Sequence, residues 1–275
     1  DNRMQKCKVI AIANQKGGVG KTTTTLNLAI GLAKNGFHVL TVDFDPQGDL
    51  TSSLGWKNSD EMDHTIASMM DATIKDNDAN FVGTVLHHPE GIDVIPSNID
   101  LSDFETRLVN EFDRENILKN CLAPIKESYD YVLIDCPPSL AMLTINALSA
   151  ADEVLIPVQA QYLPAKGMTK LLRTVSKVQR KINSNLKIAG VAITLADLKT
   201  NLAKDTIEMI HENFGQHFKV FNSVIPVAVK ASEATVSGKS VYSYARDSKV
   251  AVAYDELTKE VIHASKEKRR SDLMR

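Results

Sequence analysis

One stretch decides the fold of this 275-residue chain: Asn14-Gln15-Lys16-Gly17-Gly18-Val19-Gly20-Lys21-Thr22-Thr23. It follows an apolar, β-branched run that predicts a strand, and it leads into a segment of helical period that ends at Asn35-Gly36. A strand, a glycine-rich loop and a helix in this order are the context of a phosphate-binding loop. Glycines let the backbone wrap closely around an anion, so that several N–H groups and the helix N-terminus point toward it.

Outward from this loop, short apolar runs alternate with longer helical segments, a pattern typical of a parallel sheet with helices on both faces. The predicted strands are Val9 to Ala13, His38 to Val42, Ile92 to Ile95, Tyr131 to Ile134, Val154 to Val158, Ile188 to Thr194 and Val220 to Ile225. The predicted helices are Thr22 to Lys34, Ile117 to Lys126, Ala141 to Ala150, Ala165 to Ile182, Leu202 to Phe214 and Val250 to Lys266. The fold class is therefore α/β, a three-layer, mostly parallel, twisted sheet of the P-loop nucleotide triphosphatase type.

The domain prediction is a single ATPase domain over residues 1–275. We interpret residues 1–6 as a tag remnant and a disordered start, and residues 267–275 as a flexible basic tail. The polar stretch from Asn58 to Pro89 has apolar spacing at Ile66, Met69 and Met70, which predicts a short helix within an excursion from the sheet.

Composition limits the function classes. The net charge is −2, so the chain is not coated with basic residues, and any contact with DNA must use a local patch. The three cysteines are Cys7, Cys121 and Cys136, which are far apart and have no CxxC spacing. This pattern argues against a disulfide framework and a zinc site, and it indicates reduced thiols.

Two lysines in the loop have different expected roles. Lys21 supplies a full charge to the outer phosphates, and the hydroxyl of Thr22 is a candidate magnesium ligand. The strict pattern would have glycine where this chain has Gln15, and the chain has an additional lysine, Lys16, beside it. The stretch Lys16 to Thr23 resembles the deviant Walker A motif of the ParA/MinD family of ATPases, and the similarity extends from about Cys7 to about Lys266.

The resemblance implies that two subunits face each other across two nucleotides, so ATP would favour a homodimer. It also implies that Lys16 acts in trans, on the phosphates bound by the partner subunit. A solvated loop lysine with no role is the alternative for Lys16. The residues expected to bind ATP or ADP in the loop are Lys16, Gly17, Gly18, Val19, Gly20, Lys21, Thr22 and Thr23.

Acidic residues end two of the predicted strands, and ligands of open parallel sheets bind at the carboxyl ends of strands. Asp45 lies in Asp43-Phe44-Asp45-Pro46-Gln47, which is similar to a family motif, and the similarity gives Asp45 a catalytic role with Lys16 and Lys21. Asp45 would orient the attacking water and order a water on Mg²⁺, whereas Asp43 is a candidate structural partner. Asp135 follows an apolar run as a Walker B acid does, and it is expected to hold Mg²⁺ through water. The alternatives are an Asp-Pro turn for Asp45 and a helix cap for Asp135.

Near the C-terminal end, the segment from Val224 to Ala234 resembles the family segment that lies along the adenine. We therefore expect Pro226 and Val227 to contact the base. Lys199 and Lys230 stand at two places where ParA proteins carry exposed bases, and they are the candidate contacts to non-specific double-stranded DNA. Val227 replaces a frequent arginine, and a solvated surface charge is the alternative for each lysine.

The function that this resemblance implies is that of a ParA/Soj-type chromosome or plasmid partitioning ATPase. It would hydrolyse ATP slowly with Mg²⁺, bind DNA as an ATP dimer, and release it when a ParB-like centromere-binding protein stimulates hydrolysis. The alternative is a MinD-like, membrane-associated spatial regulator. The tail after Ile262 has too few bulky apolar residues for an amphipathic anchor, so no stable membrane anchoring is expected. The expected location is cytoplasmic, on the nucleoid of a prokaryote.

Overall fold

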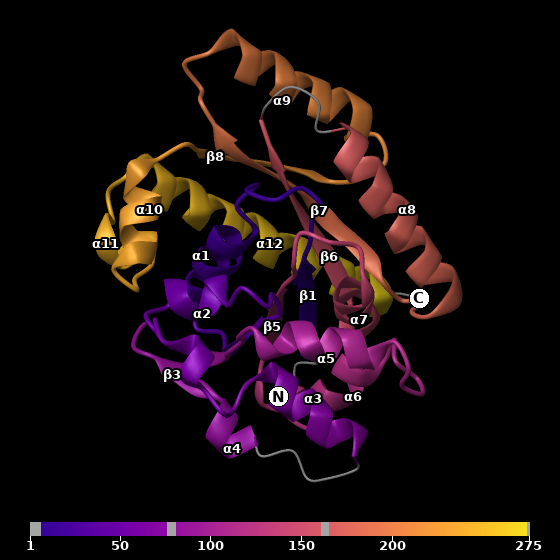
Figure 1. Cartoon of the computed structure of the whole chain (residues 1–275). Helices are drawn as coiled ribbons and strands as arrows, with labels where there is room; N and C mark the ends of the chain where they lie inside the picture. The colour runs from indigo at the N-terminus through magenta and orange to yellow at the C-terminus, as the bar shows by residue number, and fades with distance from the viewer. Residues whose placement is uncertain (1–6, 76–80, 161–164, 274–275) are drawn as a thin grey trace.

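The computed structural model describes residues 7–75, 81–160 and 165–273 (Figure 1). The residues interpreted as a tag remnant and disordered start, 1–6, lie outside this part of the chain. The strands form one eight-stranded sheet in the order β3-β4-β2-β5-β1-β6-β7-β8. Their bounds are β1 Lys8–Ile12, β2 Val39–Asp43, β3 Leu86–His88, β4 Ile92–Ile95, β5 Tyr131–Asp135, β6 Glu153–Gln159, β7 Lys187–Ala196 and β8 Val220–Pro226. All neighbouring strands pair in parallel except β3, which is antiparallel to β4.

Helices cover both faces of the sheet, which confirms the predicted three-layer architecture (Figure 1). One face is covered by α1, α2, α10, α11 and α12, and the other by α3 and α5 to α9. The helix bounds are α1 Lys21–Lys34, α2 Asp49–Ser53, α3 Ile66–Ile74, α4 Phe81–Thr84, α5 Asp100–Leu108, α6 Ile117–Leu122, α7 Met142–Ala150, α8 Ala165–Lys181, α9 Asn201–Phe214, α10 Val229–Val236, α11 Val241–Tyr244 and α12 Lys249–Leu273.

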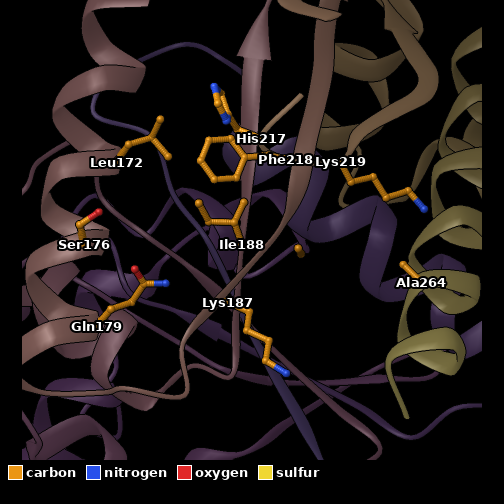
Figure 2. A pocket seen from close by; sticks show the side chains of 10 residues that line it. Leu172, Ser176, Gln179, Lys187, Ile188, His217, Phe218, Lys219 and Ala264 are labelled. Carbon is orange, nitrogen blue, oxygen red and sulfur yellow. The ribbon is translucent and has the colours of Figure 1, made fainter. Parts of the chain in front are cut away.

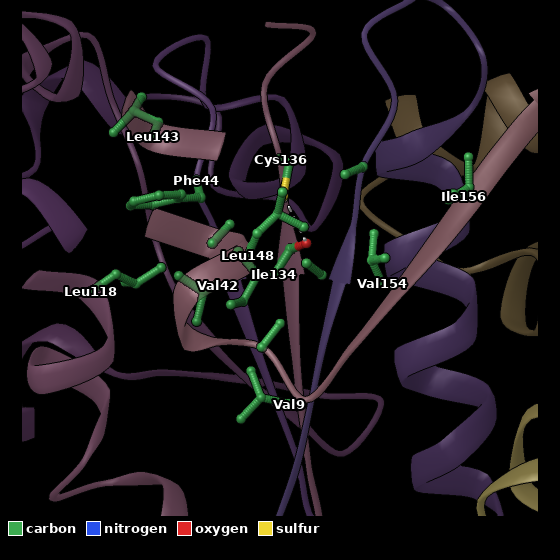
Figure 3. Packing of buried hydrophobic residues seen from close by; sticks show 14 of the residues in the cluster. Val9, Val42, Phe44, Leu118, Ile134, Cys136, Leu143, Leu148, Val154 and Ile156 are labelled. Carbon is green, nitrogen blue, oxygen red and sulfur yellow. Dashed lines mark hydrogen bonds between the residues drawn. The ribbon is translucent and has the colours of Figure 1, made fainter. Parts of the chain in front are cut away.

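The central strands are apolar at successive positions because helices bury both of their faces. In β5, Val132 and Ile134 belong to one core cluster and Leu133 belongs to the other, as the alternation of side chains along a strand requires. Figure 3 shows the first cluster, in which Ile134 lies near Val42 of β2. Since β1, β2 and β5 are neighbours in register, their carboxyl ends lie together at one edge of the sheet.

The structure differs from the sequence prediction at several boundaries. The edge strand β3 and the helix α5 were not predicted, because β3 is three residues long and α5 has a short, strongly charged sequence. The predicted helix around Ile66 is confirmed as α3. The helix α12 continues to Leu273, so the backbone of residues 267–273 is helical where the sequence indicated a flexible tail. Over the described ranges, every helix is too short or too polar to cross a bilayer.

A close approach between α1 and α12 depends on Gly31. A Cβ atom at this position would overlap the hydroxyl of the fully buried Thr258 and would lie 2.7 Å from the hydroxyl of Tyr242. We expect Gly31→Ala to lower the free energy of unfolding by about 1–3 kcal/mol, as overpacking of a core typically does. Urea denaturation checks this value.

A second variant tests whether this overlap is the cause. Adding Thr258→Ala to Gly31→Ala removes the overlapping atoms, so the double variant is expected to lose less stability than the two single losses added together. Strict additivity of the two losses would show that overlap with Thr258 does not cause the stability loss of Gly31→Ala.

Candidate nucleotide-binding site

The loop between β1 and α1 is shaped by contacts with the neighbouring strands. Gly20 caps the N-terminus of α1 with φ 81°, a left-handed conformation that glycine adopts without steric strain. The hydroxyl of Thr194 donates a hydrogen bond of 2.7 Å to the carbonyl of Val19, and the Asn14 side-chain amide donates one of 2.7 Å to the carbonyl of Pro157. These hydrogen bonds join the loop to β6 and β7 and stabilise the loop conformation.

The first residues of α1 bring the predicted magnesium ligands together. The hydroxyl of Thr22 donates to one oxygen of Asp135 at 2.7 Å, and the hydroxyl of Thr25 donates to the other oxygen at 3.1 Å. Lys21 is 7% exposed, and its amine donates to the carbonyl of Lys16 at 3.5 Å, within the loop. A hydroxyl, a carboxylate and an ammonium group therefore meet where a helix N-terminus favours anions.

Three carboxyl groups gather at the same edge. Asp43 and Asp135 are register partners on β2 and β5, and both are almost completely buried. Burial raises the pKa of Asp43 to about 7 and, together with the charge of Asp43, raises the pKa of Asp135 to about 8. Burial also raises the pKa of Asp45, and the nearby amine of Lys21 opposes this shift. This surplus of buried negative charge is the environment that a divalent cation relieves.

Asp43 makes structural contacts with the turn after β2 and with α2. Sequence analysis named it as a candidate structural partner. One of its oxygens accepts hydrogen bonds from the backbone N–H and the hydroxyl of Thr51, at 2.8 Å and 2.6 Å, and the other accepts from the N–H of Asp45 at 3.3 Å. Asp45 follows β2 and accepts a hydrogen bond from the N–H of Gln47 at 3.0 Å. Asp43 thus holds the turn that carries Asp45 and ties it to α2.

Lys16 differs from the buried Lys21 in the placement of its side chain. Its side chain is exposed, and its amine donates to the Gln159 side-chain carbonyl at 3.4 Å. The main chain of Lys16 is ordered by Asn14, whose side-chain oxygen accepts from its N–H at 3.0 Å. The backbone of Lys16 is therefore part of the loop, whereas its charge is available at the molecular surface.

A cavity of about 100 Å³ lies beside the N-terminus of α1. Its lining includes Pro226, one of the two predicted adenine contacts, together with Gly20 and Thr23 of the loop. The second predicted contact, Val227, is 59% exposed and does not line this cavity. Ala228, Ala231 and Ser232 also line it and belong to the segment Val224 to Ala234, which resembles the family's adenine segment. Sequence analysis did not place Thr194 of β7 or Tyr254 of α12 at this site, because these elements are distant from the loop and from that segment in the sequence.

The predicted DNA contacts lie on two different segments at the carboxyl edge of the sheet. Lys199 is an exposed residue in the loop between β7 and α9. Lys230 is in the first turn of α10, where its amine forms an ion pair of 3.0 Å with Glu233 and lies 5.6 Å from the centre of the Tyr244 ring. The hydrogen bond with Glu233 raises the pKa of Lys230, so this lysine remains charged, although its charge is partly offset.

The donor set fits a magnesium ion that is bound with a phosphate ligand. Among the residues that the structure describes, no group of three or more His, Cys, Asp and Glu side chains is arranged to hold a metal by itself. Mg²⁺ prefers oxygen ligands and is usually bound by one or two carboxylates or hydroxyls together with phosphates and water. The hydroxyl of Thr22 and the carboxylate of Asp135 match this requirement.

A substitution at Asp135 tests this electrostatic description. Without nucleotide, we expect Asp135→Asn to increase the melting temperature at pH 8, because the folded state no longer opposes ionisation of a carboxyl group whose pKa is raised to about 8. Below about pH 4 the carboxyl is protonated in both the folded and unfolded states, so the gain should vanish there. Thermal denaturation at both pH values, with EDTA present, measures the difference.

The same variant should lose the stabilisation that Mg²⁺ and ATP give the wild-type protein together. A gain in apo stability combined with a loss of ligand stabilisation is the expected result. If Asp135→Asn is less stable at pH 8 and is still stabilised by Mg²⁺ and ATP, the assignment of Asp135 is wrong.

The chain is similar to known proteins over most of its length. A family model described as an AAA domain matches residues 7–188. The chain is 45% identical over 255 residues to the sporulation initiation inhibitor protein Soj of Bacillus subtilis, covering 92% of this chain and 98% of Soj. It is 42% identical to the chromosome-partitioning ATPase Soj of Treponema pallidum, covering 93% of this chain and 97% of that protein.

A solved structure is also similar to this fold. It is the cobyrinic acid a,c-diamide synthase of Mycobacterium smegmatis with a bound ATP analog and magnesium, which is 35% identical to this chain. The TM-score is 0.82, and the match covers 94% of this chain and 96% of that one.

Proposed function

The chain belongs to the Soj/ParA family of chromosome-partitioning ATPases, and on this premise we propose that ATP joins two copies of it into a dimer that binds DNA and separates after hydrolysis. The protein is an ATPase that uses ATP and Mg²⁺ for DNA partitioning. The observation that best supports the proposed dimer is the opposite placement of two loop lysines. Lys21 is buried inside the loop, whereas the amine of Lys16 lies at the surface.

Nucleotide binding is assigned to the loop and the start of α1. Backbone N–H groups of residues 16–23 and the N-terminus of α1 would surround the phosphates, with the amine of Lys21 as the full positive charge. In the present structure this amine is bonded only weakly, at 3.5 Å, to the carbonyl of Lys16, so a phosphate oxygen is a stronger partner for it. The cavity lined by Pro226 would accept part of the base.

Magnesium is assigned to Thr22 and Asp135, with Asp45 acting through water. When bound, Mg²⁺ supplies charge neutralisation for the outer phosphates of ATP. Asp135 is held by the hydroxyls of Thr22 and Thr25, so its oxygens are oriented toward the start of α1. Asp45 would accept a hydrogen bond from the attacking water and align it with the γ-phosphate, since its turn is fixed by Asp43 and Gln47.

Lys16 is assigned to the partner's nucleotide. The γ-phosphate of ATP places negative charge at the boundary between subunits, and a lysine from the opposite chain can offset it there. Its bond to Gln159 is long and solvent-exposed, so releasing the amine costs little. ADP lacks the γ-phosphate, and the dimer should therefore weaken after hydrolysis.

The dimer would bind duplex DNA without sequence preference and reside on the nucleoid. Lys199 and Lys230 are exposed at the carboxyl edge of the sheet, where a phosphate backbone could contact both subunits. Phosphate contacts of this kind are strongly salt-dependent and carry no sequence information. A ParB-like, centromere-binding partner would then stimulate hydrolysis and release the dimer, and it would supply the sequence specificity.

The double variant Lys199→Ala with Lys230→Ala tests the DNA surface. In fluorescence anisotropy with a non-specific duplex, the wild-type protein should bind with ATP but not with ADP, and affinity should fall steeply as salt rises. The double variant should bind at least about tenfold more weakly and show a shallower salt dependence, because two phosphate contacts per subunit are lost. Lys119→Ala with Lys126→Ala removes the same charge from the far side of the molecule and should bind normally.

The same assay distinguishes the alternative function, a membrane-associated spatial regulator. Vesicles containing anionic lipids are sedimented with the protein and ATP. No DNA binding with any nucleotide, together with ATP-dependent sedimentation on vesicles, would reject DNA partitioning and leave the ATPase assignment unchanged.

A further inference from the structure

A second cavity, of about 480 Å³, opens at the amino ends of β7 and β8, far from the phosphate loop (Figure 2). Its walls come from α8, the start of β7, the segment 217–219 that precedes β8, and α12. The nucleotide site lies at the carboxyl ends of the strands, which is the opposite edge of the sheet. We call this second cavity the α8 groove, and neither ATP binding nor the proposed DNA surface uses it.

The base of the α8 groove is apolar and only half covered. Leu172 extends from α8 toward Ile188 of β7 and the ring of Phe218 (Figure 2). All three side chains are partly exposed, although they form one continuous surface. Burial of apolar surface is favourable by about 25 cal/mol per Å². An apolar side chain of a ligand that covered this surface would therefore bind favourably.

Positive charges flank this base on both sides. Lys187 and Lys219 line the groove itself. On α8, the exposed residues Arg173, Lys177 and Arg180 each follow a groove-lining residue by one position. One position in a helix is a rotation of about 100°, so these cations form a stripe that runs beside the groove.

Lys187 has an acidic cross-strand neighbour, Glu153 of β6, whereas the cations of α8 have no acidic residue within their own helix. Among the described residues that line the groove, none is Asp or Glu. The sequence of α8, AKGMTKLLRTVSKVQRK, also contains no acidic residue. The groove is therefore complementary to a ligand that is negatively charged along its length and apolar at one point.

We propose that the α8 groove docks an acidic peptide segment of a partner protein, with one aromatic or aliphatic side chain of that segment inserted between Leu172 and Phe218. Duplex DNA satisfies only half of this requirement, because its phosphates would pair with the stripe but leave the apolar base uncovered. A short peptide satisfies both halves, since its carboxylates can face Arg173 and Lys177 while its anchor fills the cavity. The bound segment would leave the carboxyl edge of the sheet free for ATP and DNA.

The experiment selects short peptides from a random displayed library on the full-length protein. Ser176→Trp serves as the counter-selection target, because an indole at this exposed, groove-lining position fills the cavity without removing a core residue. Enriched peptides should contain several Asp or Glu residues and an aromatic or large aliphatic residue. Synthetic copies should bind wild-type protein in anisotropy measurements, and raised salt should weaken the binding.

Matched variants locate the binding site. The selected peptides should bind Ser176→Trp and Lys177→Glu at least about tenfold more weakly, a difference of about 1.4 kcal/mol. Lys119→Glu makes the same charge change on α6 and should leave the affinity unchanged. ATP binding and the circular dichroism spectrum should be the same in all three variants, which separates a lost contact from misfolding.

Several outcomes would overturn the proposal. They are the absence of enrichment over the Ser176→Trp target, enriched peptides without acidic residues, and equal affinity for Lys177→Glu. A fourth is direct binding of non-specific duplex DNA or anionic vesicles that displaces the peptides from the wild-type protein, is abolished by Lys177→Glu and is unchanged by Ser176→Trp. That result would make the stripe a surface for phosphates rather than for a peptide.

Discussion

Asp45→Asn is expected to slow ATP hydrolysis by about 100-fold to 10,000-fold while the protein still binds ATP and still dimerises. This range is typical of the loss of a group that orients and accepts a proton from the reacting water. The variant keeps the size of the side chain, and the backbone of Asp45 can keep its bonds to Asp43 and Gly48. Its effect should therefore appear in kcat, with little change in ATP affinity.

Single-turnover hydrolysis and equilibrium ATP binding measure the two quantities separately. Asp49→Asn is a suitable control, because Asp49 is a neighbouring acid whose charge acts on Asp45 but which lies at the start of α2. The control should hydrolyse ATP within a few-fold of the wild-type rate. A normal kcat for Asp45→Asn would show that the turn after β2 is structural, as in the Asp-Pro alternative.

Lys16→Ala is expected to abolish the ATP-dependent dimer and to reduce hydrolysis by about 1,000-fold or more, as loss of a cation supplied in trans does in other phosphoryl-transfer enzymes. Binding of ATP to the single subunit should persist, because Lys21 and the N-terminus of α1 remain. Sedimentation velocity with ATP gives the oligomeric state, and phosphate release gives the rate.

Gln159→Ala provides the matched control for Lys16. It removes the side chain that accepts the Lys16 amine within the same chain but leaves the lysine itself. This variant should dimerise at least as well as wild type, since no bond has to be released first. A full dimer of Lys16→Ala with ATP would remove the role in trans.

The sequence was sufficient to predict the core of the fold because local signals and tertiary burial agree there. Residues 131–134 are apolar on both faces of a central strand, and the predicted strand, Tyr131 to Ile134, ends one residue before β5 does. The phosphate loop could be predicted because its glycines and lysines are contiguous. The pairing of Thr22 with Asp135 could be predicted because β1 and β5 are parallel neighbours. The loop after β1 and the end of β5 therefore lie at the same edge of the sheet.

Other parts of the site could not be predicted because they depend on packing between distant segments. Thr25 binds Asp135 and Thr194 fixes the loop, yet neither belongs to a recognisable motif. Val227 was placed with Pro226 because their segment resembles the family's adenine segment, but resemblance does not tell which of two neighbouring side chains faces the cavity. The α8 groove likewise depends on which helix face the sheet leaves half covered, a property that the charge pattern alone does not determine.

The central claim is that each active site combines Asp45 of one subunit with Lys16 of the other, and one mixing experiment tests it most directly. Lys16→Ala and Asp45→Asn, each nearly inactive alone, are combined in equal amounts and ATP hydrolysis is measured. In a mixed dimer, one site has an intact Asp45 from the first chain and an intact Lys16 from the second. We predict a clear recovery, to at most roughly a quarter of wild-type activity: random pairing would make about half of the dimers mixed, each with one intact site, and the weaker pairing of Lys16→Ala lowers the mixed share. If both residues act within the same chain, no mixed dimer has an intact site, and activity that stays at the level of the separate variants would contradict the account.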